Sequence, residues 1–188
     1  MTINRIIAGI FLLGALAAPA FADDITDAMD AARKAYQSGD LTNAKQSLDL
    51  ASQLIGQKNA EVFATLLPNA LPGWKADKAN TQALGMAGFG ASMASRAYQN
   101  AKGDNVEVQI TGDSAMVAQI AAFFSNPALA GAMGKLVRVG SQRAIQDNDG
   151  NVKMVIANKF MVSVEGSADA AAKLAYAQAI DVAKLSKL

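Results

Sequence analysis

The chain has 188 residues, with 17 Lys and Arg against 16 Asp and Glu, and it contains neither His nor Cys. The lack of Cys excludes disulfides, thiolate metal sites and Cys nucleophiles, and the lack of His removes the commonest general base and metal ligand. At 52% hydrophobic and 18% charged residues, the chain is too apolar to be disordered and long enough to bury a core.

The N-terminal segment 1–22 has the pattern of a Sec-type signal peptide. Arg5 precedes an apolar stretch, residues 6–18, which is shorter than the roughly 20 residues that a membrane-spanning helix needs. Ala20-Phe21-Ala22 then fits the small-x-small pattern that precedes a cleavage site. We expect cleavage after Ala22, a periplasmic location, and no integral membrane segment in the mature protein.

The charge of the mature chain is balanced. Cleavage removes Arg5, which leaves 16 basic residues (17 minus one) against 16 acidic residues. Nucleic-acid binding normally requires a basic patch, and binding to an anionic membrane surface requires a polybasic segment. We therefore expect no nucleic acid among the partners.

Residues 23–67 are predicted to form a helical hairpin followed by a short helix. Apolar residues recur at spacings of three and four on both sides of Ser38-Gly39-Asp40. Gly39 suits a left-handed C-cap, and Asp40 suits the N-cap of the second helix. We expect Gly56 to end that helix and a separate short helix to stop before Pro68.

Residues 25–58 resemble a single tetratricopeptide repeat. Ala32, Ala44 and Ala51 stand where that family has small residues, although Ala28 replaces its leading aromatic residue. The resemblance implies a helix–turn–helix unit. Because such repeats need neighbours to bury their faces and no second copy follows, we expect a hairpin that packs on the rest of the chain or on a partner.

The segment 68–73 is predicted to be a linker, because Pro72-Gly73 indicates a turn. Leu71-Pro72-Gly73-Trp74 resembles a segment of uncharacterised secreted bacterial proteins, in which it precedes an α+β domain; this resemblance implies no activity. Trp74 is the only Trp of the chain. We expect it to fill a core or to seal the junction between hairpin and domain, with stacking on a ligand as the alternative.

Residues 74–188 are predicted to form an α+β domain. Residues 105–111 alternate between apolar and polar side chains, and Lys102-Gly103-Asp104 is expected to join this strand to a strand of small residues at 88–100. A strand at 135–146 is expected to reach a tight turn at Asp147-Asn148-Asp149-Gly150, and residues 152–165 form one long strand or two.

Helices are expected from Ser114 to Ser125 and after Ser167. The order strand, glycine, helix occurs twice at an offset of 54 residues, starting at Val106 and again at Phe160. This order indicates either a strands-then-helix pseudo-repeat or a pattern that any strand–glycine–helix junction shares. In both cases the predicted fold class is α+β: an N-terminal helical hairpin, then an antiparallel sheet with helices on one face.

The candidate cofactor-binding motifs lack residues that they require at fixed spacings. The glycines of segment 85–90 lack the third glycine of a dinucleotide fingerprint, since Met93 stands there, and Gly131 to Lys135 lacks the flanking residues of a phosphate loop. Asp147 and Asp149 fit a hairpin better than a calcium loop, and the eight Met residues fit core packing better than a copper site. We expect no metal and no cofactor.

Two positions carry unusual side chains for their predicted strands. Arg143 has the parity of buried Val139 and Ile145, so it either pairs with an acidic ligand group together with Arg96 or is turned outward by a bulge at Gly140; the bulge is favoured. The small residues of segment 88–100 leave room for a docking surface. The candidate binding residues are Trp74, Phe89, Ala94, Arg96, Tyr98 and Arg143.

Two functions follow as hypotheses. The first is an exported, periplasmic, non-catalytic binding or accessory protein that holds a protein partner or an apolar small ligand. It is preferred because the chain lacks side chains that exchange protons near neutral pH. The alternative is an envelope hydrolase that uses a carboxylate pair or a Ser–Lys dyad.

Overall fold

The computed structural model describes residues 21–84, 90–112 and 114–188, so most of the expected signal peptide lies outside the described residues. The helices are α1 (Phe21–Gln37), α2 (Leu41–Leu66), α3 (Ala115–Ser125), α4 (Pro127–Met133), α5 (Ala170–Gln178) and α6 (Val182–Leu185). The strands are β1 (Trp74–Ala76), β2 (Asn80–Ala83), β3 (Ser92–Asn100), β4 (Asn105–Gly112), β5 (Lys135–Val139), β6 (Gln142–Gln146), β7 (Val152–Ile156) and β8 (Phe160–Glu165).

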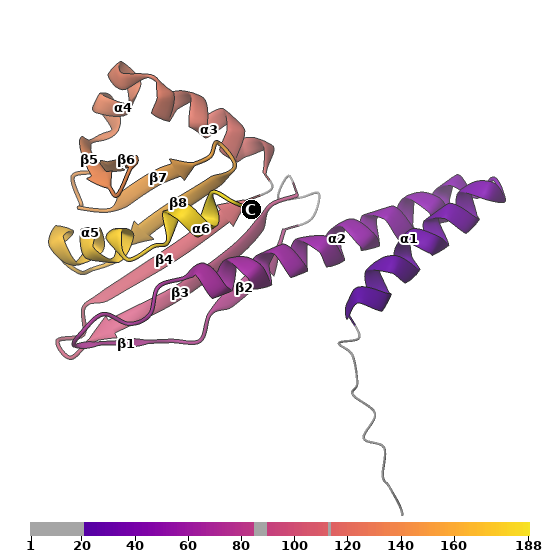
Figure 1. Ribbon diagram of the computed structural model, residues 1–188, viewed down its shortest axis with the longest axis horizontal. Coiled ribbons are helices and arrows are strands. Elements are labelled where there is room, and N and C mark those ends of the chain that lie inside the picture. Colours follow the sequence, from indigo (N-terminus) through magenta and orange to yellow (C-terminus); the bar gives the residue numbers. More distant parts are fainter. Residues whose placement is uncertain (1–20, 85–89, 113) are drawn as a thin grey trace, which may run out of the picture.

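The predicted α+β class is confirmed: a pair of helices is followed by an antiparallel sheet with further helices (Figure 1). Within the described ranges, the sheet has eight strands in the order β1-β3-β4-β8-β7-β6-β5, and β2 also pairs with β3. None of the helices in these ranges is long and apolar enough to cross a membrane.

Helix α2 is one continuous helix of 26 residues, not a helix ending at Gly56 plus a short helix. Asp40 caps its N-terminus as predicted, with its carboxylate accepting from the Asn43 amide. Gly56 does not end the helix because it serves packing instead: a Cβ there would lie 3.1 Å from the Cβ of Ala83 in β2. Tertiary packing therefore overrides the local helix-breaking preference.

The two halves of α2 have different surroundings. The first half pairs with α1, and this hairpin extends away from the sheet (Figure 1). The second half packs on the sheet, where the Phe63 ring meets Phe160 of β8 edge to face at a centroid distance of 5.5 Å. Phe63 and Leu67 belong to the main hydrophobic core. The expected boundary at 68–73 therefore does not separate the hairpin segment from the core.

The strand predicted at 135–146 is a hairpin of β5 and β6. Gly140 has φ +57 and forms the turn with Ser141, so Val139 pairs with Gln142 and Arg138 with Arg143. The expected bulge is replaced by this two-residue turn. Residues 152–165 form two strands, joined where Ala157 and Asn158 take left-handed conformations.

The helices cover both faces of the sheet. The second half of α2, with α5 and α6, covers the face that carries Val108, Val162 and Met154, and this face forms the main core. Helices α3 and α4 lie over the opposite face of β5–β7. The expectation of a single covered face is therefore correct for α5 and α6 and wrong for α3 and α4.

Candidate functional site

A half-open cavity of about 710 Å³ lies between the second face of the sheet and the α3–α4 pair. Its apolar walls come from α3, α4 and β8 and consist of Ile120, Phe123, Phe124, Leu129, Met133 and Met161. Three of these side chains, Phe123, Leu129 and Met133, are about half exposed. Large apolar side chains at the mouth of a concave site are typical of places that receive an apolar molecule.

The sheet supplies a polar floor to this cavity. Antiparallel register places Ser163 of β8 between Gln109 of β4 and Lys153 of β7. All three residues line the cavity, as does Glu165, two residues after Ser163 on the same face of β8. The pairing of β4 with β8 therefore sets part of this row, and it joins residues 54 positions apart (163 minus 109).

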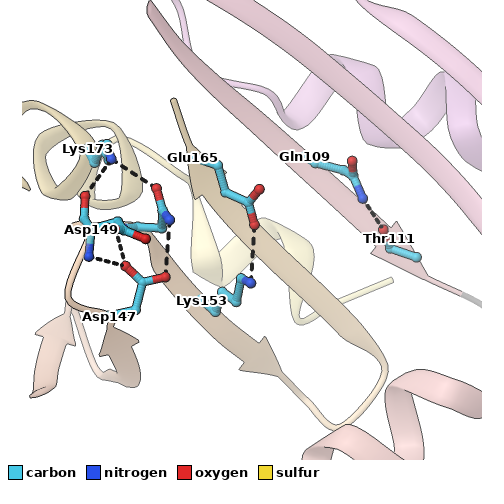
Figure 2. A network of polar contacts seen from close by, with 8 residues as sticks. Gln109, Thr111, Asp147, Asp149, Lys153, Glu165 and Lys173 are labelled. Atoms are coloured by element: carbon cyan, nitrogen blue, oxygen red, sulfur yellow. Dashed lines mark hydrogen bonds and ion pairs between the residues drawn. The ribbon is translucent and has the colours of Figure 1, made fainter. Parts of the chain in front are cut away.

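Two polar side chains of the floor pair with each other, and a third bonds to a neighbouring threonine (Figure 2). Lys153 Nζ lies 3.2 Å from Glu165 Oε1, and the Gln109 amide donates to Thr111 Oγ1 at 3.1 Å. The ion pair is about half exposed, so its net contribution to stability is small. A floor with no net charge and with both donors and acceptors suits an uncharged polar group on the ligand.

A second polar cluster in Figure 2 is structural. Asp147 accepts hydrogen bonds from the amides of Asp149 and Asn151, which closes the β6–β7 turn and lowers the pKa of its carboxyl below the usual value despite partial burial. Buried Lys173 of α5 donates to the Asp149 carbonyl at 2.7 Å and to Asn151 Oδ1 at 2.9 Å. The positively charged Lys173 side chain therefore links α5 to the β6–β7 turn through these two hydrogen bonds.

The described ranges contain no group of three or more acidic residues arranged to hold a metal ion. The Lys173 ammonium donates hydrogen bonds to the Asp149 carbonyl and Asn151 Oδ1, and the Asp147 carboxylate accepts from the turn itself, so these oxygen atoms already have partners within the chain. The prediction of a hairpin turn at Asp147–Gly150 is confirmed.

Three candidate residues meet at an internal junction. The Tyr98 hydroxyl donates to the Pro68 carbonyl at 2.6 Å, and Arg96 Nη1 donates to the same oxygen at 3.3 Å. The Trp74 ring packs edge to face on the Tyr176 ring at a centroid distance of 5.4 Å. The centroids of the Tyr98 and Tyr176 rings lie 4.4 Å apart. This junction fastens the segment after α2 to the sheet and to α5.

The remaining candidates lie apart from this junction. Ala94 is fully buried on the β3 face that α2 covers, so the chain itself occupies the docking surface predicted there. Phe89 lies outside the described residues. Arg143 is exposed, as favoured, and lines a hollow of about 290 Å³ with Phe124 and Val155. The structure does not bring Arg143 and Arg96 together, because they lie at distant strands of the sheet.

Sequence reasoning did not identify the cavity. Phe123 is half exposed and lines the cavity, although the apolar pattern of its helix gives no sign of this. The available signal was the polar residues at alternate positions of β4 and β8, such as Gln109 and Ser163. Only the strand order shows that they lie beside one another.

The class of molecule defined by these features is an α+β protein with an apolar cavity over a polar sheet floor. Comparison of the chain with protein families, curated proteins and solved structures gives no match. The function therefore has to be argued from the cavity itself.

Proposed function

We propose that this protein is a non-catalytic binding protein that holds an apolar small molecule with one uncharged polar group. The cavity between the sheet and the α3–α4 pair carries the proposal. Its volume of about 710 Å³ lies within the range of roughly 300–1,000 Å³ that small-molecule sites occupy. Its walls are apolar, and its few polar groups converge on one side.

The half-exposed side chains at the mouth support the same function. Phe123, Leu129 and Met133 come from two adjacent helices and line one cavity. An apolar ligand would remove part of their surface from water, at a gain of roughly 25 cal/mol per Å². Hydrogen bonds to Gln109 or Ser163 would fix the orientation of its polar group.

Displacement of an apolar dye tests this proposal. Ala132 of α4 lines the cavity and is exposed, so Ala132→Trp fills the site with little effect on the core. Ala122 of α3 is also exposed but lies outside the lining, which makes Ala122→Trp the matched control. We expect the wild type and the control to bind N-phenylnaphthylamine and Ala132→Trp to bind it at least about tenfold more weakly. Equal binding by all three proteins would argue against the cavity as the site.

A hydrolase remains the second candidate, since strand register gives it one specific observation. Ser163 lies opposite Lys153, and Glu107 lies opposite Glu165, so both the Ser–Lys and the two-carboxylate arrangements have neighbouring residues. Lys153 directs its ammonium to Glu165, however, and a dyad requires it to serve Ser163. Hydrolysis of p-nitrophenyl esters that is lost in Ser163→Ala but kept in Thr111→Ala would favour this candidate over the binding protein.

We further propose that the protein acts in the periplasm after removal of residues 1–22. The support is the n-region, apolar stretch and small-x-small end of this segment. Helix α1 begins at Phe21, so cleavage after Ala22 would leave the hairpin nearly whole. N-terminal sequencing of protein recovered from a periplasmic extract tests this, with Asp23 expected as the first residue.

A further inference from the structure

One face of the α1–α2 hairpin carries large apolar side chains that nothing in the described chain covers. Their exposed fractions range from 39% at Ile55 to 70% at Tyr36. The residues of this hairpin face are Met29, Tyr36, Leu41, Leu48 and Ile55. Exposed apolar surface concentrated on one element marks an interaction site more often than chance exposure does.

The five residues lie on one side because of their spacing from the helix contact. The two helices pack through alanines. Each large apolar residue lies either three positions before or four positions after one of these alanines in the sequence. For example, Tyr36 follows Ala32 by four positions, and Leu48 follows Ala44 by four positions. Positions three and four apart lie on neighbouring parts of a helix. Because the helices are antiparallel, an equal rotation along each chain brings both sets to the same side of the hairpin.

The contact between α1 and α2 is made by small side chains. Among the residues of the hairpin whose burial is described, the buried ones are Ala28 and Ala32 in α1 and Ala44 and Ala51 in α2. An amphipathic helix normally owes its stability to an apolar stripe that packs against another element. Here the larger apolar side chains are the exposed ones. They lie on a hairpin that extends away from the sheet (Figure 1).

The spacing of the apolar residues along α2 indicates which kind of partner surface packs against the hairpin face. Leu41, Leu48 and Ile55 are each seven residues apart, which is the repeat by which helices pack in coiled coils and four-helix bundles. The ion pairs Arg33–Asp30 and Lys45–Asp49 on the hairpin each join two residues of the same helix. The hairpin face therefore fits an apolar helical partner better than a strongly charged one.

The area of the face matches what a dimer of this chain needs. A fully covered Tyr buries roughly 150–250 Å², and Leu, Ile and Met bury amounts near the lower end of this range, so the five exposed fractions amount to about 500 Å² per hairpin. Two hairpins placed face to face would bury about 1,000 Å² from these residues alone, the lower limit of specific interfaces. A two-fold contact also needs only one self-complementary patch.

We propose that two copies of this protein dimerise through the hairpin face and form an antiparallel four-helix bundle. Each copy contributes α1 and the part of α2 that runs from Leu41 to Ile55. The ligand cavity is formed by other elements, so the dimer leaves it open.

The test measures the mass in solution of the full chain, expressed in a bacterium and purified, by light scattering during size-exclusion chromatography. Leu48→Glu places a charge on the hairpin face, and Tyr36→Glu does the same from α1. Leu50 provides a matched control: it is 51% exposed on the same helix, against 57% for Leu48, but stands on the other side of the alanine contact. Circular dichroism establishes that each variant retains its helices.

We expect the wild type and Leu50→Glu to have twice the monomer mass at micromolar concentration. Leu48→Glu and Tyr36→Glu should run as folded monomers, with a dimer dissociation constant raised at least about tenfold. A monomeric wild type would overturn the proposal, as would dimers that persist in both face variants or dissociate equally in the Leu50 control.

Discussion

The junction after α2 gives the most quantitative prediction, through Tyr98→Phe. This substitution removes one hydroxyl from a fully buried ring and leaves its volume almost unchanged. The hydroxyl donates to the Pro68 carbonyl at 2.6 Å, and afterwards that oxygen keeps only the longer bond from Arg96 at 3.3 Å. We expect the free energy of unfolding to fall by about 1 kcal/mol, which corresponds to about 2–4 °C in Tm for a chain of this size.

Tyr176→Phe is the matched control for this experiment. Its hydroxyl accepts from the Leu71 amide at 3.3 Å, a longer bond at a partly buried site. We expect a loss of about 0.5 kcal/mol. Urea titration followed by Trp74 fluorescence measures both variants, since Trp74 is the only Trp and packs against Tyr176.

Tyr98 also makes the stability of the protein depend on pH. Burial raises the pKa of Tyr98 to about 12 from an ordinary value of 10.0, so the folded protein keeps a proton that the unfolded chain releases. The stability linked to this group is therefore complete below pH 10 and falls as the pH rises from 10 to 12. Burial also raises the pKa of Tyr176, so Tyr98→Phe should reduce the alkaline loss without removing it. Unchanged stability at neutral pH, or an alkaline slope equal to that of the wild type, would refute the reasoning.

Three further substitutions test the turns, each by urea titration. Gly166→Ala should cost at least about 2 kcal/mol, because Gly166 has φ +137 and a Cβ there would overlap the Asn105 carbonyl; a smaller loss would mean that the two segments separate easily. Ala157→Gly should stabilise the protein by about 0.5–1 kcal/mol, since Ala157 has φ +51, and a loss of stability would contradict a left-handed turn. Lys173→Met should cost about 2 kcal/mol by leaving the Asp149 carbonyl and the Asn151 side chain without their donor, whereas a neutral effect would show that water replaces it.

Features set by local chemistry were predictable from the sequence. Val106, Val108 and Ile110 alternate with polar residues and are all fully buried in β4. The turn at Lys102-Gly103-Asp104 joins β3 to β4, and Asp40 caps α2. In each case a few adjacent residues decide the backbone conformation, so no distant contact is needed to predict it.

Features set by distant contacts were not predictable. A glycine in a strand fits both a bulge and a hairpin turn, and at Gly140 only the pairing of Arg138 with Arg143 decides between them. Gly56 stays helical because Ala83 packs against it. The cavity floor depends on the order β4-β8-β7, which a single sequence does not encode in any local pattern.

The most direct test of the central claim is native mass spectrometry of the protein purified from its host. If the cavity holds an apolar small molecule, the wild type and Ala122→Trp should retain an added mass of a few hundred daltons, and Ala132→Trp should not. Its release by organic solvent would then allow the molecule to be identified. An added mass that persists in Ala132→Trp, or a wild type that carries none and takes up no apolar probe, would contradict the account.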